Sequence, residues 1–160
     1  MKIVQSLDEQ FARLHARSRA LIGVVPADKL YLQPSAPRRH GSPPVYSCGE
    51  HLLRSAATVE QTFGGLTANL WDDPFEWTLP ETLPDAARVL EYLAEVEETR
   101  RRGFALLRGD GDLSKEIAVP SGEMRTLAAL IVETLARAAH HQGRAYATFR
   151  LFSDERAPRV

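Results

Sequence analysis

Two adjacent histidines, His140 and His141, lie in the last helical segment that the sequence predicts, residues 126–152. At about 100° per residue, His141 falls on the apolar stripe of this segment and His140 falls well off it. An imidazole that faces the interior needs a polar partner or a ligand, because an unpaired buried polar group is costly. The stripe consists of Leu127, Leu130, Ile131, Thr134, Ala138, His141, Ala145, Phe149 and Phe152. The question of function therefore turns on what faces His141.

The chain has five histidines in all. We expect His40, in a segment rich in Pro and Arg, to be solvated, and His15, beside the apolar stripe of its helix, to lie on the surface. His51 follows a helix start and flanks an apolar stripe, so it is the best partner for His141. The two could instead be hydrogen-bonded structural residues, since a third ligand is not evident. The carboxylates available to complete a metal site are Glu50, Glu60 and Glu133.

The single cysteine and the serines give less support for chemistry. Cys48 at a helix N-terminus could have a lowered thiol pKa, or it could be a small buried residue beside the cap. The sequence contains no Gly-x-Ser-x-Gly elbow, phosphate loop or Gly-x-Gly-x-x-Gly motif. One cysteine cannot form an internal disulfide, which fits a cytoplasmic location.

Four segments with helical periodicity must position these residues. They run from about residue 6 to 22, 47 to 71, 82 to 107 and 126 to 152, with almost no alternating strand pattern. The sequence therefore predicts an all-α fold, a four-helix bundle. Five prolines between residues 24 and 46 predict a long extended crossover connection between the first two helices. We expect one domain over residues 1–160, with residues 153–160 as a frayed tail.

Local signals set the ends of these helices. Ser6 with Glu9, and Ser47 with Glu50, read as capping boxes for the first two helices. Thr82 reads as the N-cap of the third, before Pro84 in the first turn. Gly64-Gly65 either kinks the second helix or permits close packing, and Gly143 is expected to interrupt the fourth. The acidic segment 109–112 lacks the ligand pattern of a calcium loop and reads as a turn.

The charge distribution excludes some partners. A formal net charge of -1 argues against a nucleic-acid binder. The basic run Arg100-Arg101-Arg102 reads as a solvated helix face rather than a phosphate site. There is no run of about 18 apolar residues, so we expect no membrane span. The N-terminal residues lack the apolar core of a signal peptide.

Three segments resemble the DinB/YfiT-like superfamily of metal-binding four-helix bundles. The segment 47–53, Ser-Cys-Gly-Glu-His-Leu-Leu, resembles the opening of that family's second helix. The segment 125–130, Arg-Thr-Leu-Ala-Ala-Leu, resembles the opening of its last helix. The segment 140–145, His-His-Gln-Gly-Arg-Ala, is similar to its His-His-Arg-Gly-Gln element. Taken in order, the matches extend from about residue 11 to 152.

The resemblance implies a divalent metal, often zinc or nickel, held by three histidines. One comes from the second helix and two come from the last helix at positions i and i+4. His141 matches the i+4 ligand, whereas Arg137 occupies position i and Arg54 the second-helix position. Arginine keeps its proton and does not ligate metals. Two of the three ligands are therefore replaced.

These observations leave three interpretations. In the first, the site has lost its metal, and Arg54, Arg137 and His141 form a cationic pocket for a small anionic molecule or the acid groups of a low-molecular-weight thiol. In the second, zinc or nickel binds through His51 and His141 with a carboxylate or His140, and the protein is a thiol S-transferase or hydrolase. In the third, the protein is a non-enzymatic module that forms homodimers. Its interface would be an exposed aromatic patch of Trp71, Phe75 and Trp77; those residues could instead cap one end of the bundle.

Overall fold

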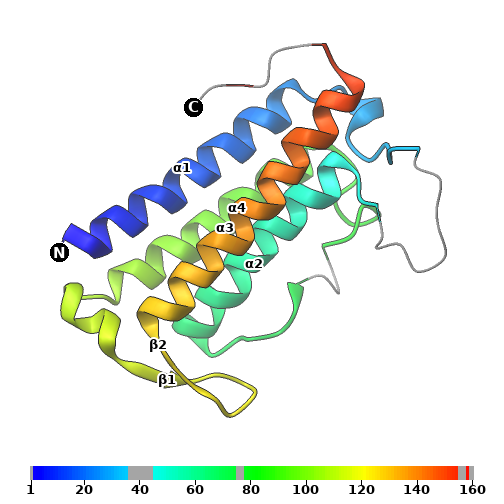
Figure 1. The fold of residues 1–160 in the computed structure, drawn as a ribbon. Coiled ribbons are helices and arrows are strands. Elements are labelled where there is room, and N and C mark those ends of the chain that lie inside the picture. The colour runs from blue at the N-terminus through cyan, green and yellow to red at the C-terminus, as the bar shows by residue number, and fades with distance from the viewer. Residues whose placement is uncertain (1, 36–44, 75–77, 155–157, 159–160) are drawn as a thin grey trace.

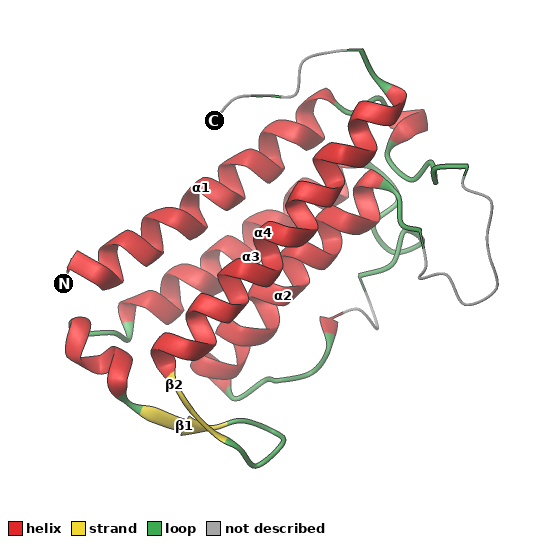
Figure 2. Ribbon diagram, in the orientation of Figure 1, coloured by secondary structure: helices red, strands yellow, loops and turns green. Residues whose placement is uncertain are grey.

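The computed structural model describes residues 2–35, 45–74, 78–154 and 158. These residues are mostly helical, as the sequence predicts (Figures 1 and 2). A small antiparallel hairpin, which the sequence pattern does not reveal, pairs Glu116 with Thr126. The elements are α1 (Lys2–Val24), α2 (Cys48–Ala68), α3 (Ala86–Ala105), β1 (Glu116–Ala118), β2 (Met124–Thr126) and α4 (Leu127–Phe152).

The start of α1 differs from the prediction. The helix begins at Lys2, so Ser6 lies inside it and does not cap it. The first-turn amides find a partner far away in the sequence: Asp110 accepts hydrogen bonds from the backbone N–H groups of Ile3 (3.1 Å) and Val4 (3.0 Å). Because the partner comes from the connection between α3 and α4, no local motif could have revealed it.

The start of α2 is as predicted. Ser47 Oγ accepts a hydrogen bond from the backbone N–H of Glu50 (3.2 Å). Glu50 Oε2 accepts one in return from the backbone N–H of Ser47 (2.7 Å). This capping box fixes the direction of the first turn of α2, which carries His51.

The end of α2 comes earlier than predicted, at Ala68, where Asn69 adopts a left-handed conformation with φ 54°. The chain then folds back, and Trp71 packs on the helix. A Cβ atom at Gly65 would lie 2.3 Å from the Trp71 ring. The glycine pair of α2 therefore serves close packing.

The N-cap of α3 is Asp85, not Thr82 as predicted. The Asp85 side chain accepts a hydrogen bond from the backbone N–H of Arg88 (2.9 Å). Thr82 lies in the preceding turn, where its hydroxyl donates to the carbonyl of Leu79 (2.9 Å). Both residue types are good caps, and the one nearer the helical segment prevails.

The start of α4 agrees with the prediction, because Thr126 accepts a hydrogen bond from the backbone N–H of Ala129 (3.2 Å). Gly143 does not interrupt this helix, which continues to Phe152. The acidic segment before the hairpin forms a 3-10 helix, η3 (Asp110–Ser114). There the Asp112 carboxylate accepts a hydrogen bond from the backbone N–H of Arg108 (2.7 Å), in agreement with a turn.

The order of the connections differs from the prediction. The backbone N–H of Gly49 donates to the carbonyl of Leu30 (2.7 Å), so α1 ends and α2 begins at the same end of the molecule. The Tyr31 hydroxyl donates to the carbonyl of Leu83, so α3 begins there too. The chain that runs the length of the helices therefore joins α2 to α3, not α1 to α2 (Figure 1). Both α1 and α2 pack against α3 and against α4.

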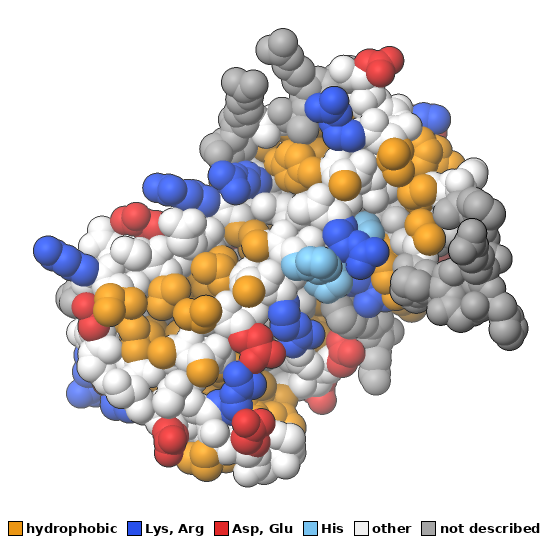
Figure 3. Space-filling view, viewed as in Figure 1, with side chains coloured by type: hydrophobic (Ala, Val, Ile, Leu, Met, Phe, Trp, Pro, Cys, Tyr) orange, Lys and Arg blue, Asp and Glu red, His pale blue; other side chains and the backbone are white. Residues whose placement is uncertain are grey.

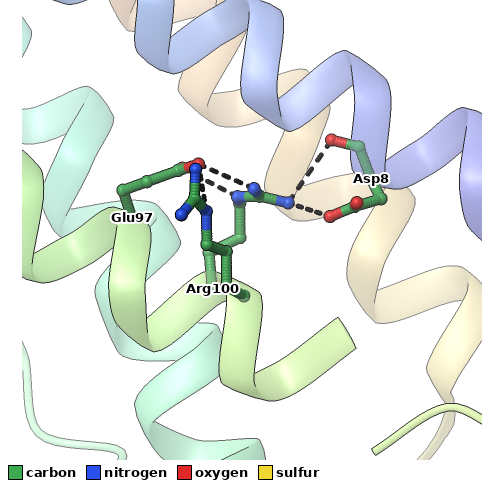
Figure 4. A network of polar contacts seen from close by, with 4 residues as sticks. Asp8, Glu97 and Arg100 are labelled. Carbon is green, nitrogen blue, oxygen red and sulfur yellow. Dashed lines mark hydrogen bonds and ion pairs between the residues drawn. The ribbon is translucent and has the colours of Figure 1, made fainter. Parts of the chain in front are cut away.

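The basic run of α3 is not uniformly solvated. Arg100 is only 3% exposed. Its guanidinium binds the Glu97 carboxylate twice, at 2.8 Å each, and pairs with Asp8 of α1 (Figure 4). Arg101 and Arg102 are exposed as predicted. Arg100 is therefore a buried residue whose ion pairs link α3 to α1.

None of the described helices combines the length and the apolar composition that a membrane span requires.

Candidate functional site

The structure brings His51 and His141 together across the contact between α2 and α4. Their ring centroids lie 6.2 Å apart, with 32° between the ring planes. His51 is buried, with 3% of its surface exposed, and His141 is half-buried. The capping box of α2 positions the first ring, and the helical phase of α4 positions the second.

Both rings carry an unsatisfied polar atom. The Nδ1 atoms of His51 and His141 are buried, and neither has a hydrogen-bond partner among the described residues. A buried polar atom without a partner costs free energy unless a ligand or water satisfies it. The pair therefore has unused hydrogen-bonding capacity in the interior.

The surroundings of His51 disfavour its protonated form. Burial, together with the positive charges of Arg144, His141 and Arg54, lowers the pKa of His51 to about 4. Glu50 acts in the opposite direction, but its carboxylate is already held by Ser47 in the capping box. His51 is therefore neutral at pH 7 and has one ring nitrogen that donates and one that accepts.

His141 lies in a similar environment. Burial lowers its pKa, and the charges of His140, Arg54, Arg137 and Arg144 act in the same direction. Both imidazoles are then neutral at pH 7, and the positive charge of the site comes from arginines. Figure 3 shows histidine and basic side chains gathered on this face of the molecule.

Arg54, which the sequence assigns to the site, is half-buried and lies over the ring of Tyr46 at 3.9 Å from the ring centroid. The same Tyr46 ring meets His51 edge-on, with centroids 5.5 Å apart. Tyr46 thus holds the guanidinium and the imidazole in place by a cation–π contact and an edge contact. Sequence reasoning missed Tyr46, although it immediately precedes the capping box.

Arg144 is the second residue that sequence reasoning missed. It lies three residues after His141 and seven after Arg137, so the helical repeat could have placed all three on one side of α4. With His51 it lines a cavity of about 280 Å³. Among the described residues, neither Arg137 nor Arg144 forms an ion pair, so two guanidinium groups near the imidazoles lack a carboxylate partner.

The two adjacent histidines differ as expected. His140 is exposed, whereas His141 turns toward α2. The neighbouring Gln142, which the stripe drawn from the sequence omitted, is buried. Its amide donates to Ser18 Oγ (2.7 Å) and to the carbonyl of Leu14 (2.6 Å), so it ties α4 to α1. His141 therefore lies at the border of the interior.

The donor set does not fit the zinc or nickel ion that the family resemblance implies. The described residues contain no group of three or more His, Cys, Asp or Glu that could hold a metal ion. Glu60 accepts a hydrogen bond from Tyr92, and Glu133 pairs with Arg125 at 2.6 Å. Two imidazoles surrounded by guanidinium groups form a poor cation site.

The remaining candidates carry no chemistry of their own. Burial raises the pKa of Cys48 to about 12, so it behaves as a small buried residue and not as a reactive thiolate. His15 is half-buried beside Glu97 rather than fully on the surface, and burial lowers its pKa. His40, Phe75 and Trp77 lie outside the described residues.

In comparisons with known proteins, no family model, no curated protein and no solved structure matched the chain.

Proposed function

We propose that this protein is a DinB/YfiT-like four-helix bundle whose metal site has become an anion site. It binds a small anionic ligand at the face of α2 and α4 that carries Arg54, Arg137, Arg144, His51 and His141. The observation that carries the proposal is the pair of unpartnered buried Nδ1 atoms among three guanidinium groups.

The division of roles follows from the protonation states. Both imidazoles are neutral at pH 7, so they contribute hydrogen bonds and not charge. Guanidinium groups bind carboxylates and phosphates in a forked geometry, and such charge-assisted bonds are about twice as strong as neutral ones. An anion placed among these groups would accept hydrogen bonds from the imidazoles and charge-assisted bonds from the guanidinium groups. The carboxylates of a low-molecular-weight thiol have the chemistry that this site recognises.

A metal-dependent thiol transferase or hydrolase has less support. That interpretation needs a third ligand beside His51 and His141, and Glu60 and Glu133 are held by other residues.

The interpretation as a dimeric module has less support as well. Of the proposed aromatic patch, Trp71 is half-buried on Gly65, and the other two residues lie outside the described part of the chain.

The first experiment is elemental analysis of the untagged protein, followed by separate calorimetric titrations with zinc, nickel, acetate and phosphate. We expect no stoichiometric metal and saturable binding of at least one anion. Arg137→Gln with Arg144→Gln should weaken anion binding about tenfold or more. The single variants Arg137→Gln and Arg144→Gln are each compared with Arg150→Gln, which likewise removes one positive charge from an exposed position on the same helix.

Stoichiometric metal in the purified protein would overturn the proposal in favour of the transferase or hydrolase. Failure of acetate, phosphate and benzoate alike to bind would also overturn it. If Arg150→Gln weakened binding as much as the other single variants, the effect would come from net charge and not from this site.

A further inference from the structure

The cavity beside His51 is lined by both polar and apolar side chains. It measures about 280 Å³. His51, Arg144 and Thr148 contribute an imidazole, a guanidinium and a hydroxyl to its lining. The rest of the wall is apolar and consists of Pro34, Val45, Tyr46, Ala147 and Leu151. A small inorganic anion would bind the polar groups and leave the apolar side chains in contact with water.

We infer that the ligand is an amphipathic monocarboxylate, in which a compact apolar or aryl group is attached directly to the carboxylate. This inference rests on the proposed anion site and specifies its substrate class. The carboxylate lies at His51 and Arg144, and the apolar group lies against the wall that Tyr46 and Leu151 provide.

The polar side chains of the cavity suit one carboxylate. Arg144 supplies a guanidinium that has no ion pair among the described residues, and His51 lines the cavity with a neutral imidazole, which carries one N–H donor. A carboxylate can accept from both at once, because it has two oxygens and about four acceptor positions. The two donors come from different helices, so the carboxylate would bridge α2 and α4.

The apolar part of the lining is preorganised, because the position of the Tyr46 ring is fixed by its neighbours. The Tyr46 ring is held between the Arg54 guanidinium, 3.9 Å from its centroid, and the edge of His51. A wall that is already fixed costs little ordering entropy when a ligand arrives. The volume lies just below the range of roughly 300–1,000 Å³ for pockets of drug-sized ligands. Both features favour a small, rigid occupant over a long flexible chain.

The test compares four probes on the full-length protein by calorimetry: acetate, phosphate, benzoate and the neutral isostere benzamide. We expect benzoate to bind about tenfold or more tightly than acetate, because its ring leaves water. Benzamide should not bind detectably. Arg144→Gln should weaken benzoate and acetate alike, by about tenfold or more.

Two further variants test whether the apolar side chains contact the ligand and whether the ligand binds in this cavity. Leu151→Ser changes an exposed side chain, so folding is preserved. It should weaken benzoate and leave acetate unchanged. Arg13→Gln is the control for the larger cavity of about 620 Å³ between α1 and α4, which Arg13 lines. This variant should have no effect on benzoate.

The outcomes are distinguishable. Binding of acetate or phosphate as tight as that of benzoate, weakened by Arg144→Gln, would overturn the amphipathic ligand and keep the anion site. Benzoate binding that responds to Arg13→Gln and not to Arg144→Gln would overturn this inference by moving the ligand to the other cavity. If no probe binds, the proposed function itself fails.

Discussion

His51 and His141 face each other from α2 and α4 with their ring centroids 6.2 Å apart, and neither Nδ1 has a partner among the described residues. Ninety residues of sequence separate them, and burial lowers both pKa values. A structural histidine pair would normally satisfy its buried nitrogens within the protein. This pair does not, which is why we assign it a ligand.

The two adjacent histidines of α4 should behave differently. We expect His141→Ala to weaken benzoate or acetate binding several-fold, because the His141 ring packs beside the His51 ring that lines the cavity. His140→Ala should change the affinity less than twofold or so, since that side chain is exposed. Calorimetric titration measures both. Equal effects would contradict the assignment of His141 to the inner side of the helix.

Histidines at the two positions where the DinB/YfiT-like resemblance implies metal ligands should create a metal site. The double variant Arg54→His with Arg137→His adds two imidazoles near His51 and His141. It should raise zinc or nickel affinity about tenfold or more, as the ligand number reaches that of ordinary zinc sites.

The control for that experiment is Arg54→Gln with Arg137→Gln, which removes the same charges and adds no ligand. Its metal affinity should stay low. If the histidine variant showed no gain over this control in a calorimetric titration, the correspondence of Arg54 and Arg137 with family ligands would be wrong.

Stability should fall as the pH drops from about 7 toward 4. The unfolded chain takes up a proton on His51 near its ordinary pKa of 6.5, whereas the folded protein resists this until about 4. The unfolded state therefore binds more protons in this window, so the free energy of unfolding decreases with falling pH. His141 and His15, whose pKa values are also lowered, act in the same direction.

Thermal unfolding at pH 7 and pH 5 measures this effect. His51→Gln should make the difference in Tm between the two values smaller, because the variant has no proton to take up. A pH dependence identical to that of the unaltered protein would show that His51 is protonated in the fold at pH 5.

The buried ion pair of Arg100 should be a large contributor to stability. Arg100→Met keeps most of the apolar stem and leaves the Glu97 carboxylate, with its side chain only 11% exposed, without its main partner. We expect a loss of about 3 kcal/mol or more in the free energy of unfolding, measured by urea denaturation. The matched control is Arg101→Met, which removes an exposed partner of the same carboxylate and should cost less than about 1 kcal/mol. Similar losses for the two variants would contradict the buried role of Arg100.

Two helical glycines should respond to alanine with opposite signs. A Cβ atom at Gly103 would lie 2.4 Å from the Phe63 ring, so Gly103→Ala should cost about 1–3 kcal/mol through overpacking. Nothing lies within 4 Å of a Cβ atom at Gly143, so Gly143→Ala should stabilise α4 by up to about 1 kcal/mol. Urea denaturation of the two variants provides the comparison. A destabilising effect at Gly143 would show that a contact exists there.

Local sequence determined much of the secondary structure. The start of α2 follows from the Ser47–Glu50 capping box, and the start of α4 follows from Thr126, because each cap is a hydrogen bond over three residues. The outward position of His140 also follows from the sequence, since helical phase is a property of consecutive residues. These features need no partner elsewhere in the chain.

Tertiary structure alone decided the rest, because each remaining feature depends on residues far apart in the sequence. Asp110 accepts hydrogen bonds from the start of α1, Asp8 pairs with the buried Arg100, and Ser18 accepts a hydrogen bond from the buried Gln142 of α4. The crossover between α2 and α3 depends on which helix ends meet. The sequence alone identified His51 and His141 as candidates, whereas only the packing of α2 on α4 placed them together and added Tyr46 and Arg144 beside them.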